Sequence, residues 1–375
     1  MNAARTNLDM LQRLAAERPQ QTVEELALND FYGHADLLKR YTGISRKSPL
    51  RAIIEHGSRL GDTNWDNEVD APYFIYFTWS HRRFPTVQAH ADKACFSLGP
   101  LIEYAPPVRP DRLQKFRTEY GRNLLFFPSH STHWVDANHN IDSICTRLKN
   151  FNKDFNTIRI CMYWRDIQRG MHHAYVKHGF PVECAGHMYD KHFYTRLREL
   201  IETATVTASM TIGSCIGHSL SLNRPYWHLE EPVEFTSNHS TQFEKIDQAI
   251  QQRTISKTIR EQFQPGRYSI TPEQRVFAVT AFGLGQKKSP EALTRIITLG
   301  QEIWTLSKNP ADNGNRLLGC MMLAKSLEHL FLNNLRTATQ LTAEALKMAP
   351  GPAKDILAYI TREGRSRSAQ RETAS

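Results

Sequence analysis

The sequence predicts an α/β protein of two domains followed by a helical appendage. Short apolar runs alternate with helical patterns as far as about residue 230, as in parallel sheets covered by helices. From residue 272 to about 360 the pattern is helical only. A chain of 375 residues and 43.1 kDa also exceeds what one hydrophobic core usually serves. We therefore expect domains over 1–115 and 116–270, a helical appendage over 271–362 and a flexible tail over 363–375.

The first domain is predicted from one helical stretch and three short strands. Apolar spacing over 22–41 fits helical turns better than strand alternation. The runs 51–56, 73–79 and 94–99 are apolar and are stopped by turn residues or polar loops, which is typical of parallel strands. The proline-rich segment 104–112 then predicts a crossover between the domains, because proline cannot continue a helix interior or a central strand.

The second domain has the alternation of a doubly wound sheet. We expect a polar loop after the first of its strands, SHSTHWVDANHN. The predicted strands are 123–128, 157–164, 180–186, 204–210 and 224–229, with helices at 142–150, 166–178 and 189–203. Ligands of such sheets bind beyond the carboxyl ends of the strands. The loops after Phe127, Trp164, Ala185 and Met210 should therefore converge on one crevice.

The remaining chain predicts packed helices. Between Pro272 and about Ile360 we expect four helical segments, broken near 287–289, 309–315 and 333–336. A helical-hairpin repeat is the alternative, but no 34-residue self-similarity supports it.

Composition sets limits on location and partners. No run approaches the roughly 18 apolar residues of a membrane-spanning helix, and the N-terminus lacks the apolar core of a secretory signal. The six cysteines form no CxxC pair, so we expect a cytoplasmic protein with reduced thiols.

The net charge of +9 favours phosphate-bearing partners. No basic-aromatic RNA-binding motif occurs, so we expect no nucleic-acid partner. Tail arginines 365, 367 and 371 leave a peripheral contact with anionic membrane open.

A glycine-rich turn gives the strongest chemical signal. In TASMTIGSCIGHSLSLNRP a strand-like run is followed by Gly213, Ser214 and Gly217 and then by a helical pattern. Glycines let the backbone approach a ligand closely, and free N–H groups at a helix start attract phosphate oxygens. The alternative is a simple tight turn, because the loop is neither GxGxxG nor Walker A.

A serine-histidine turn gives the second signal. Ser129, His130 and Ser131 follow a predicted strand, where they could bind phosphate or sugar hydroxyls, or move a proton. A polar loop that caps the next helix explains them equally well. Zinc is disfavoured: His130 and His133 are three apart, but there is no HExxH, no cysteine pair and no acidic partner at ligand spacing.

Further candidates follow other predicted strands. Glu55 and His56 end a strand of the first domain, and either could remove a proton from an acceptor hydroxyl; strand-end packing is the alternative. Arg165 and His187 follow strands of the second domain. The absence of GxSxG argues against a serine hydrolase.

These motifs together resemble the bacterial glycosyltransferase-like proteins associated with capsule and surface-polysaccharide functions. The resemblance runs over about residues 35–230. It is carried by EHG (55–57), SLGPLIEYA (97–105), LLFFPSHST (124–132), MYWRDI (162–167), AGHMYDKHFYTRLRELIETA (185–204) and TIGSCIGHSLSLNRPYW (211–227). Cys215 and His218 depart from a family loop that reads more like GTHIGY.

The resemblance implies a GT-B architecture of two facing Rossmann-like domains, with the acceptor held by the first and a nucleotide-sugar donor by the second. It implies metal-independent glycosyl transfer to a hydroxyl of a polysaccharide, glycolipid or glycoprotein, with no cofactor. The expected catalytic residues are Glu55, His56 and His130. The expected donor-binding residues are Ser129, Ser131, Arg165, His187, Gly213, Ser214, Gly217 and His218. A noncatalytic scaffold and a nucleotide-sugar epimerase remain as alternatives.

Overall fold

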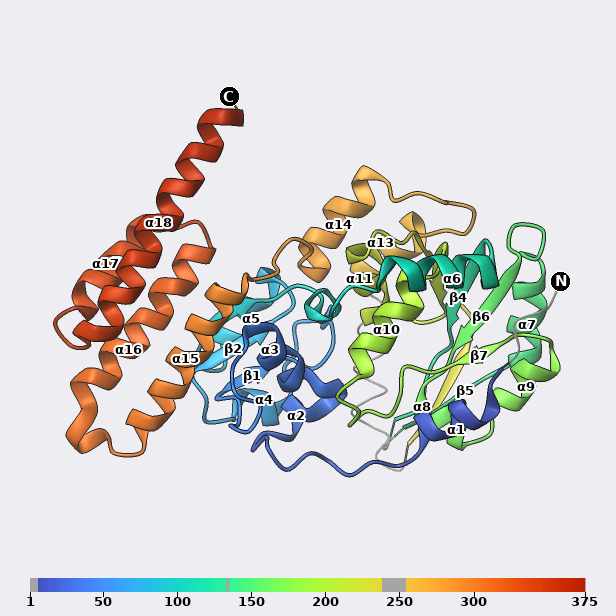
Figure 1. The fold of residues 1–375 in the computed structure, drawn as a ribbon, viewed down its shortest axis with the longest axis horizontal. Coiled ribbons are helices and arrows are strands. Elements are labelled where there is room, and N and C mark those ends of the chain that lie inside the picture. The colour runs from blue at the N-terminus through green and yellow to red at the C-terminus, as the bar shows by residue number, and fades with distance from the viewer. Residues whose placement is uncertain (1–5, 133–134, 238–253, 375) are drawn as a thin grey trace.

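The computed structural model describes residues 6–132, 135–237 and 254–374. The backbone contains two parallel sheets and a C-terminal group of helices (Figure 1). The predicted α/β class, with two Rossmann-like modules built on parallel sheets and a helical C-terminal part, is confirmed.

The sheet of the first module has three parallel strands in chain order. Its strands are β1 (Ala52–Ile54), β2 (Ile75–Thr78) and β3 (Ala94–Ser97). All their side chains are buried, which is why they form continuous apolar runs in the sequence. The helices of this part of the chain are α2 (Ala27–Asp30), α3 (His34–Thr42), α4 (Asp66–Val69) and α5 (Phe84–Gln88).

The sheet of the second module has five parallel strands in the order β7-β6-β4-β8-β9. Its strands are β4 (Asn123–Phe127), β6 (Thr157–Cys161), β7 (Val182–Glu183), β8 (Val206–Ser209) and β9 (Tyr226–His228). The chain starts in the middle at β4, builds outward to β7 and then returns to the other side of β4 with β8. The topological switch point, where ligands of such sheets bind, therefore lies between β4 and β8.

Helices accompany this second sheet as the alternation predicts. They are α6 (Pro110–Tyr120), α7 (Ile141–Lys149), α8 (Trp164–Gln168), α9 (His172–Lys177), α10 (Phe193–Glu202), α11 (Ser214–Ser221) and α13 (Thr254–Gln262). The predicted proline-rich crossover ends inside α6, because Pro110 occupies the first helical position, where its missing N–H costs nothing.

An antiparallel ribbon differs from the sequence prediction. Part of the expected polar loop is β5 (Val135–His139), which pairs with β10 (Val233–Ser237). The sequence VDANH shows no apolar alternation, so nothing in the hydropathy pattern identifies it as a strand.

Two segments pack across the boundaries expected from sequence. Helix α1 (Leu8–Ala15) packs against α8, and its Leu11 and Ala15 belong to the core of the second sheet. Helix α15 (Pro290–Ser307) packs on the first sheet, where Gly300 allows close approach: a Cβ there would lie 3.0 Å from Ile75 Cγ1. The first sheet therefore gains part of its cover from the C-terminal helices.

The C-terminal helices are α14 (Pro272–Phe282), α15 (Pro290–Ser307), α16 (Pro310–Phe331), α17 (Leu335–Ala345) and α18 (Pro350–Ala374). The break expected near 309–315 falls at 308–309, because Pro310 already starts α16. The segment expected as a tail continues the backbone of α18 to Ala374. In the described part of the chain, no helix combines the length and apolar character needed to cross a membrane.

Candidate functional site

The switch point brings together two stretches that are far apart in the sequence. Phe127 at the end of β4 pairs with Ser209 at the end of β8, and Met210 N donates to Phe127 O at 3.4 Å. The serine-histidine turn after β4 and the glycine turn after β8 therefore leave the same edge of the second sheet.

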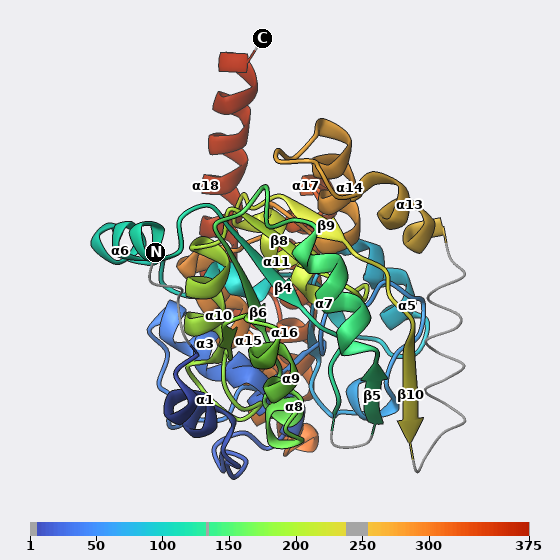
Figure 2. The same ribbon diagram turned by 90° about the vertical axis from the view of Figure 1, so that its right-hand side faces the viewer.

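The first module contributes the turn after β1. The Ser58 backbone N–H and hydroxyl lie 3.0 Å and 3.2 Å from Ser214 Oγ at the start of α11. A Cβ on Gly57 would lie 3.4 Å from the same oxygen. Trp79, just after β2, also packs on α11, with its ring centroid 4.9 Å from that of His218. The carboxyl ends of β1 and β2 thus meet the helix that follows β8, and Figure 2 gives a second view of these elements.

The start of α11 combines an open approach with helix N–H groups. Gly213, the N-cap residue, is extended, and a Cβ added to it would meet no heavy atom within 4 Å. The first N–H groups of a helix have no acceptor within the helix, and the helix dipole favours negative charge there. Ser214 Oγ is already engaged by Ser58, so a ligand would use the backbone N–H groups or displace Ser58.

Aromatic and imidazole rings from both modules surround this junction. We call them the junction cluster: Tyr32, His34, His56, Trp65, His130, Tyr163, Tyr194 and His218. His56 stacks between Trp65 and Tyr32, at centroid distances of 5.0 Å and 5.7 Å. His130 contacts Tyr163 at 4.7 Å. Apart from His56, His130 and His218, the sequence analysis singled out none of these residues.

Tyr32 holds a strained backbone at the centre of the cluster. Its φ is 56°, which is costly for a bulky residue, and Gly33 follows with φ 67°. The Tyr32 N–H donates to Met188 O at 2.5 Å, and its hydroxyl lies 3.0 Å from that of Tyr163. A Cβ on Gly33 would lie 2.7 Å from Lys191 Cα. The first module is thereby fixed against the loops after β6 and β7.

The imidazoles of the cluster are held neutral. Burial lowers the pKa of His56 to about 3, assisted by the positive charges of Arg59 and of a protonated His130. Burial also lowers the pKa of His218 to about 3. Surrounding protein lowers the pKa of His130 below 6.5, although Asp166 opposes the shift; the His130 side chain remains exposed to solvent. Of these three, only His130 is both neutral at pH 7 and freely exposed.

Glu55 supports the turn that carries His56, but its carboxyl does not reach the junction of the two modules. Its carboxyl is fully buried and accepts from Arg83 Nε at 2.7 Å. Burial raises its pKa to about 7 in spite of Arg83. Neighbouring Glu68, which the sequence analysis missed, accepts the His56 N–H at 2.9 Å and the Tyr76 hydroxyl at 2.9 Å. The expected contact of Glu55 with an acceptor is therefore corrected: this network positions the His56 turn.

The serines after β4 are also buried. Ser131 is fully buried, and its Oγ accepts from Arg169 Nη1 at 2.6 Å and from Ala137 N at 3.0 Å. These bonds fix the turn to β5, and Ser131 is a buried packing residue in this structure; its role in binding the nucleotide-sugar stays a prediction. Ser129 has 3 % exposure. Between them, His130 is the residue that presents its side chain.

Three other predicted donor-binding residues pack in the interior. A Cβ on Gly217 would lie 2.9 Å from both Phe282 and Trp79, so this glycine permits close packing and does not face phosphates. His218 is 3 % exposed and packs on Trp79. His187 is fully buried against Trp164, at a centroid distance of 4.0 Å. The direct donor contacts expected of these residues are corrected to packing.

Arg165 lies in the first turn of α8, after β6, and is partly exposed. Its Nε is buried without a hydrogen-bond partner among the described residues. His133, the second histidine of the zinc alternative, lies outside the described residues. Within the described ranges no three His, Cys, Asp or Glu side chains gather as a metal site.

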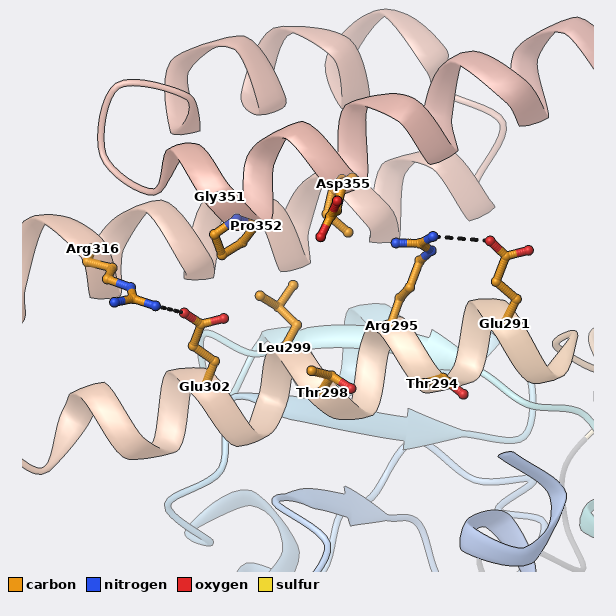
Figure 3. Close-up of a pocket in the computed structure, with 11 residues that line it drawn as sticks. Glu291, Thr294, Arg295, Thr298, Leu299, Glu302, Arg316, Gly351, Pro352 and Asp355 are labelled. Carbon is orange, nitrogen blue, oxygen red and sulfur yellow. Dashed lines mark hydrogen bonds and ion pairs between the residues drawn. The ribbon is translucent and has the colours of Figure 1, made fainter. Parts of the chain in front are cut away.

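A separate hollow of about 580 Å³ lies among the C-terminal helices (Figure 3). It contains none of the predicted site residues. Glu291 and Arg295 form one ion pair in it, and Glu302 and Arg316 form another. Asp355 of α18 lies opposite α15 across the hollow.

Comparisons with known proteins give a likeness to solved structures and none to a family or a curated sequence. No protein-family model and no curated protein sequence matches the chain. Among solved structures, a Staphylococcus aureus MnaA–UDP co-structure aligns with a TM-score of 0.36 and 10% sequence identity, over 73% of this chain and 72% of that chain.

Proposed function

We propose that the chain is an enzyme that uses a nucleotide-sugar and transfers its sugar to an acceptor hydroxyl at the junction of the two modules. The observation that carries the proposal is the meeting of three strand ends: the β1 turn at Ser58, the β4 turn at His130 and the start of α11 at Ser214. The last two lie at the switch point of a doubly wound sheet, where such folds bind nucleotides.

The start of α11 is proposed to hold the donor phosphates. Its free N–H groups and the space beside Gly213 suit phosphate oxygens. When the bond between the sugar anomeric carbon and the phosphate oxygen breaks, negative charge grows on the leaving phosphate. Fixed N–H dipoles would stabilise that charge without reorganisation.

His130 is proposed as the general base. It would accept the proton of the acceptor hydroxyl while that oxygen bonds to the anomeric carbon. His130 is preferred to His56 because it is exposed at the surface and because the charge of Asp166 partly offsets the lowering of its pKa by burial. A pKa of about 3 makes His56 a weak base. His56 and Glu68 would then position the turn after β1.

Calorimetric titration of the folded protein with UDP-, GDP-, dTDP- and CMP-sugars tests the donor. We expect one nucleotide class to bind. No binding by any member, in protein with an intact unfolding transition, would overturn the proposal. Product analysis of the bound donor without an acceptor then separates transfer from the alternative of epimerisation, because an epimerase converts the donor alone.

A further inference from the structure

A face at the amino edge of the second sheet carries a group of arginines. Helix α6 leads into β4 there, residues 223–225 lead into β9, and α14 packs beside α11. Figure 1 shows α6 and α14 along the upper side of the molecule. We call this the arginine face: Arg117, Arg122, Arg224, Arg267 and Arg275, with Tyr268, Val276 and Val279. Arg122 and Arg224 lie just before β4 and β9, at the opposite end of the strands from the candidate site, whereas the C-terminal end of α14 reaches Trp79.

The arginine face is unusual because its guanidinium groups lack carboxylate partners. Many arginines elsewhere, such as Arg51, Arg159 and Arg196, lie within 4.0 Å of a carboxylate. Within the residues described, none of the five arginines of this face has a carboxylate oxygen at that distance.

Contacts hold these arginines in one connected surface. Arg122 lies over the Tyr268 ring at 4.4 Å, and Arg275 donates to Asn223 Oδ1 at 3.2 Å and 3.3 Å. Burial lowers the pKa of Arg224, and the nearby positive charge of Arg117 lowers it further. Like charges held this close are compensated when an anion binds.

Acidic side chains on this face only partly offset the charge. Glu273 interacts with Arg267, Glu202 interacts with Arg224, and Asp154 interacts with Tyr268. Glu119 is exposed on α6. The five arginines outnumber these acidic residues, so a small positive surplus remains on the face as a whole, although α14 itself contains one glutamate and one arginine.

Exposed apolar side chains accompany the arginines. Val276 is 69 % exposed and Val279 is 48 % exposed, and their spacing of three places them on one side of α14. Tyr268 is 40 % exposed. Two exposed valines beside arginines offer nucleic acid no favourable contact. A bilayer interface, in contrast, accommodates aliphatic and aromatic side chains, and its anionic headgroups attract arginine.

We propose that the arginine face docks on an anionic phospholipid surface. Arg117 and Arg275 would contact headgroup phosphates while Val276 and Val279 enter the headgroup boundary. The proposal does not depend on the function proposed for the junction, and it concerns a different surface from the C-terminal arginines.

Sedimentation of the full chain with vesicles tests it. The vesicles are phosphatidylcholine alone, or phosphatidylcholine mixed with phosphatidylglycerol. We expect the wild type to bind only to the anionic vesicles. In an Arg117→Gln, Arg275→Gln variant the affinity for these vesicles should fall by roughly fivefold for each arginine neutralised. A Val276→Ser, Val279→Ser variant should lose the binding that persists in added salt. Both pairs are solvent-facing, so circular dichroism should match the wild type.

Arg336→Gln and Val176→Ser are the matched controls, because both side chains are exposed on other surfaces. Equal losses in the controls would overturn the proposal, as would equal binding to neutral vesicles or no binding to either. Binding of an oligonucleotide with the same variant dependence, without vesicle binding, would reassign the surface to nucleic acid and overturn it too.

Discussion

Ser58 and Ser214 join the two modules through one shared oxygen. Both the backbone N–H and the hydroxyl of Ser58 reach Ser214 Oγ, at 3.0 Å and 3.2 Å. Because Ser214 is also the first residue of α11, the turn after β1 lies against the helix start that would receive donor phosphates. Binding at this helix start and contact between the modules are therefore coupled.

Removing that oxygen should weaken the junction measurably. We expect Ser214→Ala to lower the free energy of unfolding by about 1 kcal/mol, since the Ser58 N–H loses its acceptor. Ser58→Ala removes only the hydroxyl bond, and the pair should show a coupling energy of about 0.5 kcal/mol in a double-mutant cycle followed by urea unfolding. Strictly additive effects would contradict the contact.

Gly213→Asn should separate ligand binding from stability. Asparagine is a good N-cap residue, and the space at this position is empty, so the unfolding transition should keep or exceed its wild-type midpoint. The added side chain would occupy the approach to the α11 N–H groups, and we expect nucleotide-sugar affinity to fall at least tenfold, as a rough estimate. Gly314→Asn, at an exposed helical glycine, is the control that should bind normally.

His130→Gln should reduce turnover more than binding. Loss of a general base typically lowers kcat by roughly 10²- to 10⁴-fold, with donor affinity nearly unchanged. Because the pKa of His130 lies below 6.5, the wild-type rate should be level at neutral pH and fall only on acidification. The variant should lack that acidic limb. An unchanged pH–rate profile would exclude His130 as the base.

Glu55 should make stability fall as pH rises. Its pKa is raised from 4.5 to about 7 in the folded protein, so between these values the folded state holds a proton that the unfolded state has lost. Stability from this group is complete below about pH 4.5 and is lost as pH approaches 7. The wild type should therefore lose stability relative to Glu55→Gln across this window. The free energies of unfolding of the two proteins are measured by chemical denaturation. If their difference stayed constant from pH 4.5 to 7, this prediction would be wrong.

Gly217 should tolerate no side chain. A Cβ would approach Phe282 and Trp79 to 2.9 Å, and overpacking of this kind costs about 1–3 kcal/mol. Thermal or urea unfolding of Gly217→Ala, compared with Gly213→Ala, measures the cost. Equal stability of the two variants would show that the neighbouring rings give way.

Hydropathy patterns predicted the strands of both parallel sheets because those strands are buried on both faces. The run 94–99 contains β3, and 204–210 contains β8. The same reasoning missed β5, whose residues are polar, and placed no helix at Pro110, where proline begins one. Helix α1 could not be assigned to the second sheet, since its packing partner α8 lies more than a hundred residues away.

The candidate site was predicted less completely than the fold. Strand ends correctly indicated the edge where His130 and Ser214 lie. They could not distinguish side chains that reach the junction from those that turn inward, such as Ser131 and Gly217, because burial depends on distant residues. Tyr32 and Trp65 were missed for the same reason: an aromatic residue outside a motif looks like core, and only tertiary contacts set it beside His56.

The chain passes between the modules at three places: the segment from α1 to α2, and two neighbouring passages. The two neighbouring passages contact each other. The first passage, at 101–110, is bonded to the second, at 283–288: Lys287 Nζ donates to Glu103 O at 2.8 Å, and Lys288 N donates to Tyr104 Oη at 2.9 Å. A Cβ on Gly283 would lie 1.9 Å from Trp79 O. With the segment between α1 and α2, three covalent connections join the modules, and together they limit opening as well as sliding and twisting. A single proteolytic nick in any one of them would leave both halves attached.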